Sequence, residues 1–212
     1  MQPYLGLLLD LDGTLADTEP QHCAAWLEML AEELDLRYDE QWFGQWIGTS
    51  DRVVADWLIE KHGLQQTVDE MIEAKKDRFH LMVRESGRSF PGVTARLSSL
   101  HQRFPMAIAT NSGRADTEVV VPALGLDRYV KTVVTATDVA NLKPAPDIYL
   151  LAAGRLGLDP AKCIAIEDSA PGGLAAKAAG CYLIGLNEGV SGADEVISDN
   201  AAALDRAAVL LG

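Results

Sequence analysis

Short apolar runs bounded by turn residues recur along most of the chain. The first covers residues 4–9, ends at Asp10 and is followed by Gly13 and Thr14. A short run that is apolar throughout is typical of a strand buried on both faces of a sheet. Four more runs of this kind are expected to form strands, at residues 106–110, 132–135, 163–166 and 182–185.

Helical patterns separate these expected strands. We expect helices at residues 93–102, 115–124, 145–156 and 172–179, and a last packed helix at 201–211. Strands that alternate with helices favour an α/β fold with a doubly wound, Rossmann-like parallel sheet. Ligands bind at the carboxyl ends of the strands in such sheets, so the residues that follow each strand are the first candidates for a site.

One interval, residues 17–87, contains no convincing strand. Apolar residues recur there at helical spacing within residues 21–34, 52–61 and 68–83. The sequence therefore predicts an all-helical domain at 17–87, inserted into a core formed by residues 1–16 and 88–212. We expect four tryptophans in the interior of the insertion, Trp26, Trp42, Trp46 and Trp57. We expect three basic residues on a solvated face, Lys75, Lys76 and Arg78.

Composition narrows the class of partner. Hydrophobic residues make up 48% of the chain and charged residues 23%, which is an ordinary globular balance. The formal net charge is −13, from 18 basic and 31 acidic residues. Nucleic acid is not expected as a partner, because binding its phosphate backbone needs clustered Lys and Arg. Any site for an anion must be built locally, from a cation, a few basic side chains and backbone N–H groups.

The cysteines and the apolar stretches bear on the compartment. Cys23, Cys163 and Cys181 form neither a disulfide framework nor a metal-ligand spacing. The chain opens without a charged segment followed by an apolar signal segment, and no apolar stretch is long enough to span a bilayer. We therefore expect a cytoplasmic setting without a membrane partner. We also expect a monomer, although nothing in these patterns bears on the oligomeric state.

Asp10 and Asp12 stand at alternate positions directly after the first expected strand. Gly13 and Thr14 then turn the chain, which can bring both carboxylates and several backbone N–H groups to one point. Asp10 is a candidate nucleophile and Asp12 a candidate general acid and base. An ordinary Asp-containing turn is the alternative, and this motif alone does not decide between the two.

Hydroxyl, amide and ammonium groups follow at two further places. Thr110, Asn111 and Ser112 come after the second expected strand, where they can bind a phosphoryl oxygen or cap the next helix. Lys143 stands in the extended segment before Pro144, where it can point at the site or lie on the solvated surface.

Two adjacent acids, Glu167 and Asp168, follow the fourth expected strand. Carboxylates at the end of a buried strand are costly unless they meet a cation. Mg²⁺ prefers carboxylate oxygen and water as ligands, so a magnesium site is the favoured interpretation. Ser169 is a candidate cap for the helix that follows.

With these residues the chain resembles the haloacid dehalogenase superfamily of phosphotransferases. The four motifs of that superfamily are present in order: Asp10-x-Asp12-Gly13-Thr14, Thr110, Lys143 and Glu167-Asp168. Residues 142–147 and 167–172 are similar to the subgroup that contains β-phosphoglucomutases and small sugar-phosphate phosphatases. The helical insertion is similar to the cap domain of that subgroup, so the resemblance covers essentially the whole chain.

The resemblance implies a covalent mechanism. Asp10 would attack phosphorus and form an aspartyl-phosphate, while Asp12 would protonate the leaving oxygen and then deprotonate the incoming water or sugar hydroxyl. Mg²⁺ would be held by Asp10, the backbone carbonyl of Asp12, and Asp168, with Glu167 as a ligand directly or through water.

The resemblance also implies contacts to the phosphoryl oxygens. These would come from Lys143 and Thr110, together with the backbone amides of Leu11, Asn111 and Ser112. Dehalogenases resemble this pattern without the second acid, since a halide leaving group needs no proton donor. Asp12 therefore favours phosphate chemistry.

Contacts to the rest of the substrate are implied mainly in the insertion. His22 matches a histidine of β-phosphoglucomutases, or it is a polar residue on the first inserted helix. Arg52 follows a loop, residues 48–51, that is similar to a substrate loop of the subgroup, or it is a solvent-exposed residue of a first helical turn. The full set of substrate-binding candidates is Glu19, His22, Arg52, Asn111, Ser112 and Arg114.

These expectations describe a Mg²⁺-dependent phosphatase that acts on a small phosphorylated metabolite, a sugar phosphate. The alternative is a β-phosphoglucomutase-type phosphosugar isomerase, which His22 favours. Those mutases carry a lysine where this chain has Gly113, with Arg114 beside it, and this weakens the mutase interpretation. A non-catalytic binding protein on the same fold is a third possibility, which the complete set of acids opposes.

Overall fold

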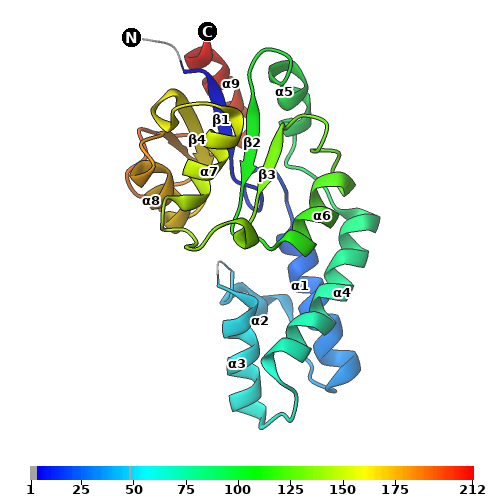
Figure 1. Ribbon diagram of the computed structural model, residues 1–212. Coiled ribbons are helices and arrows are strands. Elements are labelled where there is room, and N and C mark those ends of the chain that lie inside the picture. Colours follow the sequence, from blue (N-terminus) through cyan, green and yellow to red (C-terminus); the bar gives the residue numbers. More distant parts are fainter. Residues whose placement is uncertain (1–3, 48) are drawn as a thin grey trace. The chain divides into compact units, whose positions relative to one another are not determined.

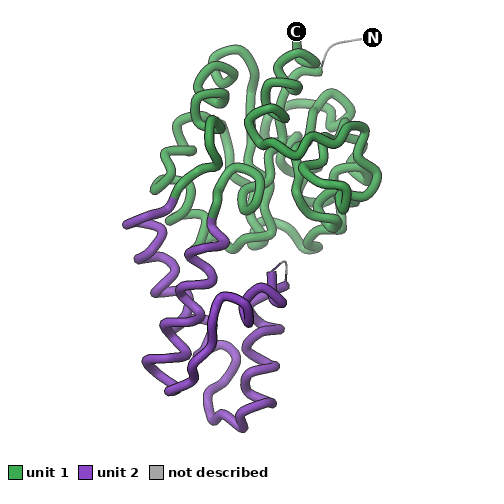
Figure 2. The backbone as a smooth tube through the Cα atoms, turned by 180° about the vertical axis from the view of Figure 1, so that it is seen from behind, with its two compact units in different colours: residues 1–17, 88–212 green, residues 18–87 purple. Residues whose placement is uncertain are grey.

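The computed structural model describes residues 4–47 and 49–212. Gly48, the first residue of the expected substrate loop, lies outside the described residues. The chain divides into two compact units, shown in two colours in Figure 2. The first unit comprises Met1–Asp17 and Arg88–Gly212, and the second comprises Thr18–Gly87.

A parallel sheet forms the centre of the first unit. In the described part of the chain its strand order is β3-β2-β1-β4-β5-β6, and every neighbouring pair is parallel. The strands are β1 (Gly6–Leu9), β2 (Met106–Ala109), β3 (Thr132–Val134), β4 (Cys163–Glu167), β5 (Tyr182–Gly185) and β6 (Glu195–Val196). All residues of β1 and β2 are buried, which explains their continuous apolar sequences.

Helices cover both faces of this sheet (Figure 1). One face carries α7 (Asp147–Leu156) and α8 (Ala170–Ala178). The other carries α5 (Val93–Leu100), α6 (Arg114–Ala123) and α9 (Asn200–Leu211). Two short 3₁₀ turns, η1 (Ala136–Asp138) and η2 (Pro160–Lys162), lie in connections. The prediction of a doubly wound, Rossmann-like α/β sheet is confirmed.

Some local predictions differ from the structure. The sixth strand, β6, was not predicted, because two residues that pair only with Ile184 and Gly185 leave no periodic pattern to detect. The helix expected from residue 145 begins at Asp147, since Pro146 occupies the position before its first turn.

Small and branched residues fill the space between the sheet and the α7–α8 face. The buried members of this cluster include Leu8, Ala107, Ala109, Val134, Ile148, Tyr149, Ala152, Ala165, Ala175 and Leu183. Among the described residues, no helix combines the length and apolar character needed to cross a membrane.

The second unit is helical throughout its described elements. These are α1 (Glu19–Glu33), α2 (Glu40–Gly44), α3 (Asp51–His62) and α4 (Val68–Ser86). The unit has its own apolar core, formed by Trp26, Met29, Leu30, Phe43, Val54, Ala55, Leu58 and Met71. The other three tryptophans, Trp42, Trp46 and Trp57, are partly buried and pack against it. The single-turn helix α2 is too short for its pattern to have been recognised.

The predicted solvated position of Lys75 was wrong. Its side chain is 1% exposed, and its ammonium donates to Asp51 Oδ2 at 2.8 Å and lies 2.6 Å from His22 Nδ1. Lys75 falls four residues after Met71 and four before Phe79, both buried on the face of α4 that packs toward α1. The helical spacing therefore placed it in the buried stripe, although its charge suggested the opposite.

Candidate active site

The candidate site lies where the connections of the sheet change direction. β1 pairs with β2 on one side and with β4 on the other, so the chain leaves neighbouring strands toward opposite faces. Asp10 follows β1, Thr110 follows β2, and Glu167 is the last residue of β4. This is the switch point at which doubly wound sheets bind ligands.

A tight turn carries the chain away from Asp10. The carbonyl oxygen of Leu11 accepts hydrogen bonds from the amides of Thr14, Leu15 and Ala16. Gly13 has a φ of 79°, and a Cβ at that position would lie 2.1 Å from Asp168 Oδ2. Only glycine meets both demands, because it tolerates the left-handed conformation and leaves room for the neighbouring carboxylate.

Lys143 links the two sides of the site. Its ammonium donates to Asp10 Oδ1 at 2.6 Å and to Glu167 Oε1 at 2.5 Å, and the side chain is 3% exposed. Burial alone would lower the pKa of Lys143, but the charges of Asp10 and Glu167 outweigh it and raise that pKa above its ordinary value. Lys143 therefore stays protonated, and the solvated-surface alternative is excluded.

Asn111 fastens the backbone of Lys143. The amide N–H of Lys143 donates to Asn111 Oδ1 at 3.0 Å, and Asn111 Nδ2 donates to the Lys143 carbonyl at 3.4 Å. These paired contacts join the loop after β2 to the segment before α7. The sequence predicted Asn111 only as a donor to substrate, because such a side chain–backbone pairing across 32 residues leaves no local pattern.

Glu167 is a fully buried carboxylate with several donors. Its Oε1 accepts from Lys143 and, at 2.6 Å, from the hydroxyl of Tyr149. Its Oε2 accepts from the hydroxyl of Ser169 at 3.0 Å and from the Ser169 amide at 3.3 Å. The Ser169 hydroxyl also accepts from the Gly172 amide, so Ser169 caps α8 as the sequence suggested.

The remaining acid of the first motif contacts the loop after β2. Ser112 donates its hydroxyl hydrogen to Asp12 Oδ2 at 2.5 Å. The Ser112 amide donates to the Thr110 hydroxyl at 3.0 Å, and Thr110 is 2% exposed. Neither side chain caps the next helix, since α6 begins at Arg114 after Gly113. The structure thus brings Asp12 beside Ser112 rather than leaving the acid in an independent turn.

Three carboxylates converge in a way that fits a divalent cation. Asp10, Glu167 and Asp168 each offer one oxygen, and these oxygens lie within 4.8 Å of one another. Burial and the charge of Glu167 raise the pKa of Asp10 well above its ordinary value, although Lys143 opposes them. Burial and Glu167 raise the pKa of Asp168 to about 6. One ammonium cannot balance three acids, and hard oxygen donors in this number suit a metal such as Mg²⁺.

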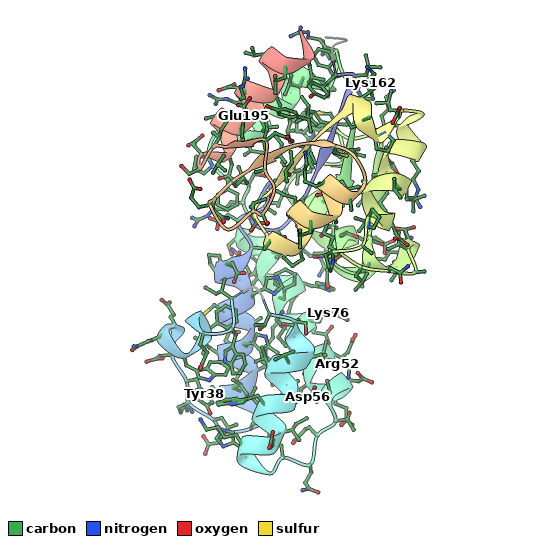
Figure 3. All side chains as sticks on the ribbon, turned by 90° about the vertical axis from the view of Figure 1, so that its left-hand side faces the viewer. Tyr38, Arg52, Asp56, Lys76, Lys162 and Glu195 are labelled. Carbon is green, nitrogen blue, oxygen red and sulfur yellow. The ribbon has the colours of Figure 1, made fainter. Side chains whose placement is uncertain are left out.

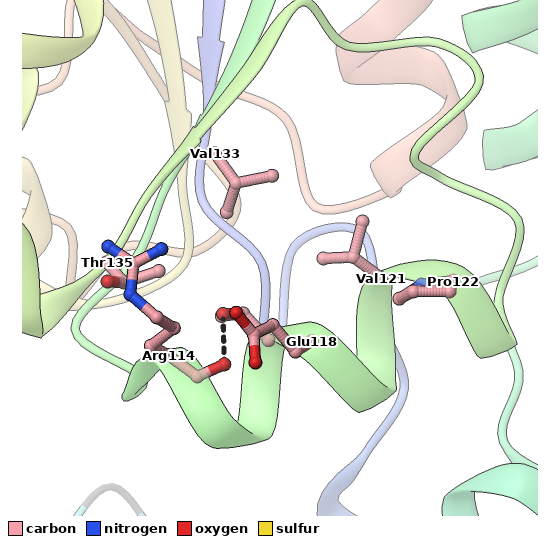
Figure 4. Close-up of a pocket in the computed structure, with 7 residues that line it drawn as sticks. Arg114, Glu118, Val121, Pro122, Val133 and Thr135 are labelled. Atoms are coloured by element: carbon pink, nitrogen blue, oxygen red, sulfur yellow. Dashed lines mark hydrogen bonds between the residues drawn. The ribbon is translucent and has the colours of Figure 1, made fainter.

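Arg114 is not part of this convergence in the structure. Its guanidinium donates to Asp138 Oδ1 at 2.8 Å. Arg114 also lines a surface hollow of about 220 Å³ beside α6, together with Glu118, Val121, Pro122, Val133, Thr135 and Thr117 (Figure 4). None of the converging carboxylates lines this hollow.

The candidate substrate-binding residues of the second unit lie in different environments. His22 lies beside Lys75 and stacks on the ring of Phe79, with centroids 4.0 Å apart. Glu19 is the first residue of α1 and is exposed. Arg52, labelled in Figure 3, is exposed and donates to Asp69 Oδ1 at 2.7 Å.

Comparison with known proteins agrees with the geometry of the first unit. A family profile for haloacid dehalogenase-like hydrolases matches residues 4–180. The chain belongs to this family. The sequence-based assignment is therefore confirmed, as is the prediction of an enzyme of the phosphoric monoester hydrolase class.

Relatives of this hydrolase cover most of its length. A fructose-1-phosphate phosphatase of Escherichia coli, YqaB, is 38% identical over 177 residues, which are 84% of this chain and 93% of the relative. The phosphoglycolate phosphatase of Escherichia coli is 32% identical over 206 residues, covering 87% of this chain and 81% of that enzyme. The structure of a Thermotoga maritima protein provisionally described as a β-phosphoglucomutase superposes with a TM-score of 0.83 at 28% identity, over 95% of this chain and 97% of the other.

Two residues of the hydrolase site were missed by the sequence analysis. Tyr149 falls in an apolar helical stretch and was taken as part of that pattern. Asn187 follows β5 and donates its side-chain amide to the backbone carbonyl of Asp168 at 2.5 Å. A polar residue after a strand was the available signal for Asn187, whereas nothing local distinguishes Tyr149 from a core aromatic residue.

Proposed function

We propose that this hydrolase is a Mg²⁺-dependent phosphatase that acts on a sugar phosphate or a similarly small phosphorylated metabolite through an aspartyl-phosphate at Asp10. The observation that carries the proposal is the contact between Lys143 and Asp10 at the switch point of the sheet, beside two further carboxylates. This arrangement holds an anionic nucleophile next to positive charge where a ligand is expected.

Asp10 would serve as the nucleophile. One of its carboxylate oxygens would attack phosphorus as the bond from phosphorus to the leaving oxygen breaks. Lys143 would support this step in two ways, by opposing the rise in the pKa of Asp10 and by neutralising charge on the phosphoryl oxygens. The 2.6 Å contact gives the ammonium a position from which it can reach both.

Asp12 would handle the protons. It would donate a proton to the leaving oxygen and then take one from the water that attacks the aspartyl-phosphate, so that inorganic phosphate and the Asp10 carboxylate are released. The Ser112 hydroxyl would orient the Asp12 carboxylate for both steps. Thr110 and the amides after β2 would contact the phosphoryl oxygens.

Asp10 and Asp168 would hold the Mg²⁺ ion, together with the backbone carbonyl of Asp12. Glu167 would contact it through water, because its two oxygens already accept from Lys143, Tyr149 and Ser169. When bound, the cation supplies charge neutralisation between the acids and the anionic phosphate. Asn187 would hold Asp168 in place as a ligand through its hydrogen bond to the Asp168 backbone carbonyl.

The second unit would act as a cap that selects the substrate. It is built from helices with a core of its own, inserted between β1 and α5. Glu19, His22 and Arg52 are its proposed contacts to the substrate. The names of the two relatives, a fructose-1-phosphate phosphatase and a phosphoglycolate phosphatase, support a small phosphorylated metabolite.

A β-phosphoglucomutase-type isomerase is the second candidate. The similarity to the Thermotoga maritima structure favours it, as does a histidine at position 22. Gly113 in place of a lysine opposes it, and Arg114 beside it does not substitute for that lysine in the structure, because its guanidinium binds Asp138.

The cytoplasmic setting and the monomeric state stay predictions.

A phosphate-release assay separates these candidates. The purified protein would be given fructose 1-phosphate, phosphoglycolate and β-glucose 1-phosphate, the last with a bisphosphate primer. Each would be tested with Mg²⁺ or with chelator, while phosphate and isomer are measured separately. Mg²⁺-dependent release that is lost in Asp10→Asn supports the phosphatase. Conversion of β-glucose 1-phosphate to glucose 6-phosphate without phosphate release would replace it by the isomerase, and release that persists in Asp10→Asn would remove the covalent step.

A further inference from the structure

Tyr149 contacts both partners of the buried ion pair. Its hydroxyl donates to Glu167 Oε1 at 2.6 Å, and Lys143 Nζ lies 5.2 Å from the centre of its ring. The side chain is completely buried in the first turn of α7. Tyr149 therefore touches the candidate site through Glu167 and Lys143.

The shared acceptor makes this contact more than packing. Glu167 Oε1 accepts from Lys143 and from Tyr149, while Ser169 holds Oε2. Donors on both oxygens fix the plane of a carboxylate, which otherwise rotates about its terminal bond. With that plane fixed, Glu167 can hold the ammonium of Lys143 at one point.

The chemistry of the buried ring supports a specific role. A phenylalanine would fill the same space in the core without a polar group that needs a partner. Burying a hydroxyl costs free energy unless it is hydrogen-bonded, and the partner of this one is an acid of the candidate site. The neighbouring residue Gly172 also leaves room for that acid, since a Cβ there would lie 2.0 Å from the Glu167 carboxyl carbon.

We propose that Tyr149 is a positioning residue, whose hydroxyl fixes Glu167 so that Glu167 holds Lys143 beside Asp10. The kinetic consequence rests on the proposed function, because Lys143 is assigned there to the phosphoryl group. The arrangement itself does not, because it concerns only residues of this chain.

The first test compares two matched tyrosines. Tyr149→Phe removes the hydroxyl and keeps the ring, and Tyr182→Phe is its control. The Tyr182 hydroxyl makes the same kind of hydrogen bond, donating to Glu195 Oε1 at 2.6 Å. Tyr182 and Glu195, which is labelled in Figure 3, are not among the residues of the candidate site. We expect kcat to fall about tenfold in Tyr149→Phe, with KM changed less than threefold, and both constants to stay within twofold of wild type in Tyr182→Phe. An unchanged kcat in Tyr149→Phe would overturn the proposal.

A double-mutant cycle shows whether Tyr149 acts through Glu167. In a Glu167→Gln background, where the carboxylate is already lost, Tyr149→Phe should change kcat by less than twofold. The same tenfold loss in both backgrounds would overturn the proposal, because it would mean that the hydroxyl acts by another route. A loss of kcat that came from impaired folding would be accompanied by a lowered unfolding midpoint in both tyrosine variants. The kcat effects of Tyr149→Phe and Glu167→Gln would then not be coupled.

An activity-independent measurement follows the ammonium of Lys143 directly. A ¹H–¹⁵N spectrum of lysine ammonium groups should show a slowly exchanging Lys143 signal, assigned by its loss in Lys143→Met. That signal should broaden or disappear in Tyr149→Phe and persist in Tyr182→Phe; its persistence in both would overturn the proposal.

If Tyr149→Phe does not fold, the wild-type protein still gives an answer. Its Tyr149 hydroxyl proton should exchange slowly enough to be seen, and a hydroxyl in fast exchange would overturn the proposal. These spectra hold even if the protein releases no phosphate, so the failure of the proposed function is distinguishable from the failure of this inference.

Discussion

The ammonium of Lys143 lies 2.6 Å from the carboxylate of Asp10, although 133 residues separate them in the sequence. Both are buried, and Glu167 completes the contact from the other side of the ammonium. One positive charge therefore serves two acids, with Asp168 close by.

Lys143→Met should abolish most of the activity while the protein stays folded. Methionine keeps the length of the chain but removes the charge that would neutralise the phosphoryl group, so we expect kcat to fall by about three orders of magnitude, or about 4 kcal/mol of transition-state stabilisation. Lys162→Met makes the same change at a half-buried position outside the candidate site (Figure 3) and should leave kcat within twofold. A loss below about tenfold in Lys143→Met would mean that its role is misassigned.

Gly172→Ala should disable the site from the α8 side. Its Cβ would meet the Glu167 carboxylate at 2.0 Å, so either the helix or the acid must move. We expect a loss of about 1–3 kcal/mol in the free energy of unfolding, together with a drop in kcat.

Gly154→Ala is the matched control, because Gly154 lies inside α7 with no atom near its virtual Cβ. Alanine there should stabilise the protein by about 0.5–1 kcal/mol and leave kcat unchanged. Equal effects of the two substitutions on stability, measured by denaturant unfolding, would show that Glu167 tolerates a Cβ at position 172.

Ser112→Ala should slow turnover without much effect on stability. The hydroxyl of Ser112 donates to Asp12 Oδ2, so its loss removes one of the contacts that orient the proposed proton donor. We expect kcat to fall about tenfold, or about 1.4 kcal/mol. Ser99→Ala removes a hydroxyl that donates to the Arg96 carbonyl within α5, and it should behave as wild type. If Ser112 instead contacts the substrate, as the sequence suggested, KM will rise more than kcat falls.

Acid should destabilise the second unit through Asp51. Burial alone would raise the pKa of Asp51, but Lys75 and its hydrogen bonds outweigh it and hold that pKa below its ordinary value. A depressed folded pKa means that Asp51 contributes stability above its unfolded pKa of about 3.9 and loses that contribution as the pH falls through the lower folded value. Unfolding curves followed by tryptophan fluorescence should therefore show stability falling below about pH 4.

Two matched variants separate the contribution of Asp51 to stability from other effects of pH. Asp51→Asn should be less stable at neutral pH by on the order of 3 kcal/mol, because Lys75 stays buried without its acid, and its stability should depend less on pH below about 4. Asp56→Asn, an exposed change on the same helix (Figure 3), should follow the wild-type curve. Parallel curves for all three proteins would contradict the assignment. The four tryptophans all lie in the second unit, so the fluorescence reports on that unit alone.

The sequence predicted well those features that depend on local patterns. The strand that precedes Asp10 and the strand that ends at Glu167 were expected within two residues of their ends, because a buried parallel strand requires an unbroken apolar run. Their order in a doubly wound sheet then implied that the polar residues after them share one edge. Asp10, Asp12, Lys143, Glu167 and Asp168 were all named as candidates from this reasoning.

Contacts that depend on side chains distant in the sequence could not be predicted in the same way. Lys75 and Lys76 are neighbours with the same charge, yet one is buried against Asp51 and the other pairs with Glu73 on the surface side of α4. Arg114, a candidate contact to the substrate, meets Asp138 in the structure. The identity of each partner depends on how helices pack, which the residue type alone does not contain.

By itself, the sequence determined the α/β sheet, the inserted helices and the acids that end the strands, because periodicity and chain order dictate which faces are buried and which ends meet. Only the tertiary structure decided that Tyr149, Ser169 and Lys143 share the oxygens of Glu167, and that Asn111 fastens the backbone of Lys143. Hydrogen bonds act over a few ångströms between groups brought together by folding. Their partners are therefore set by packing geometry, which no local pattern records.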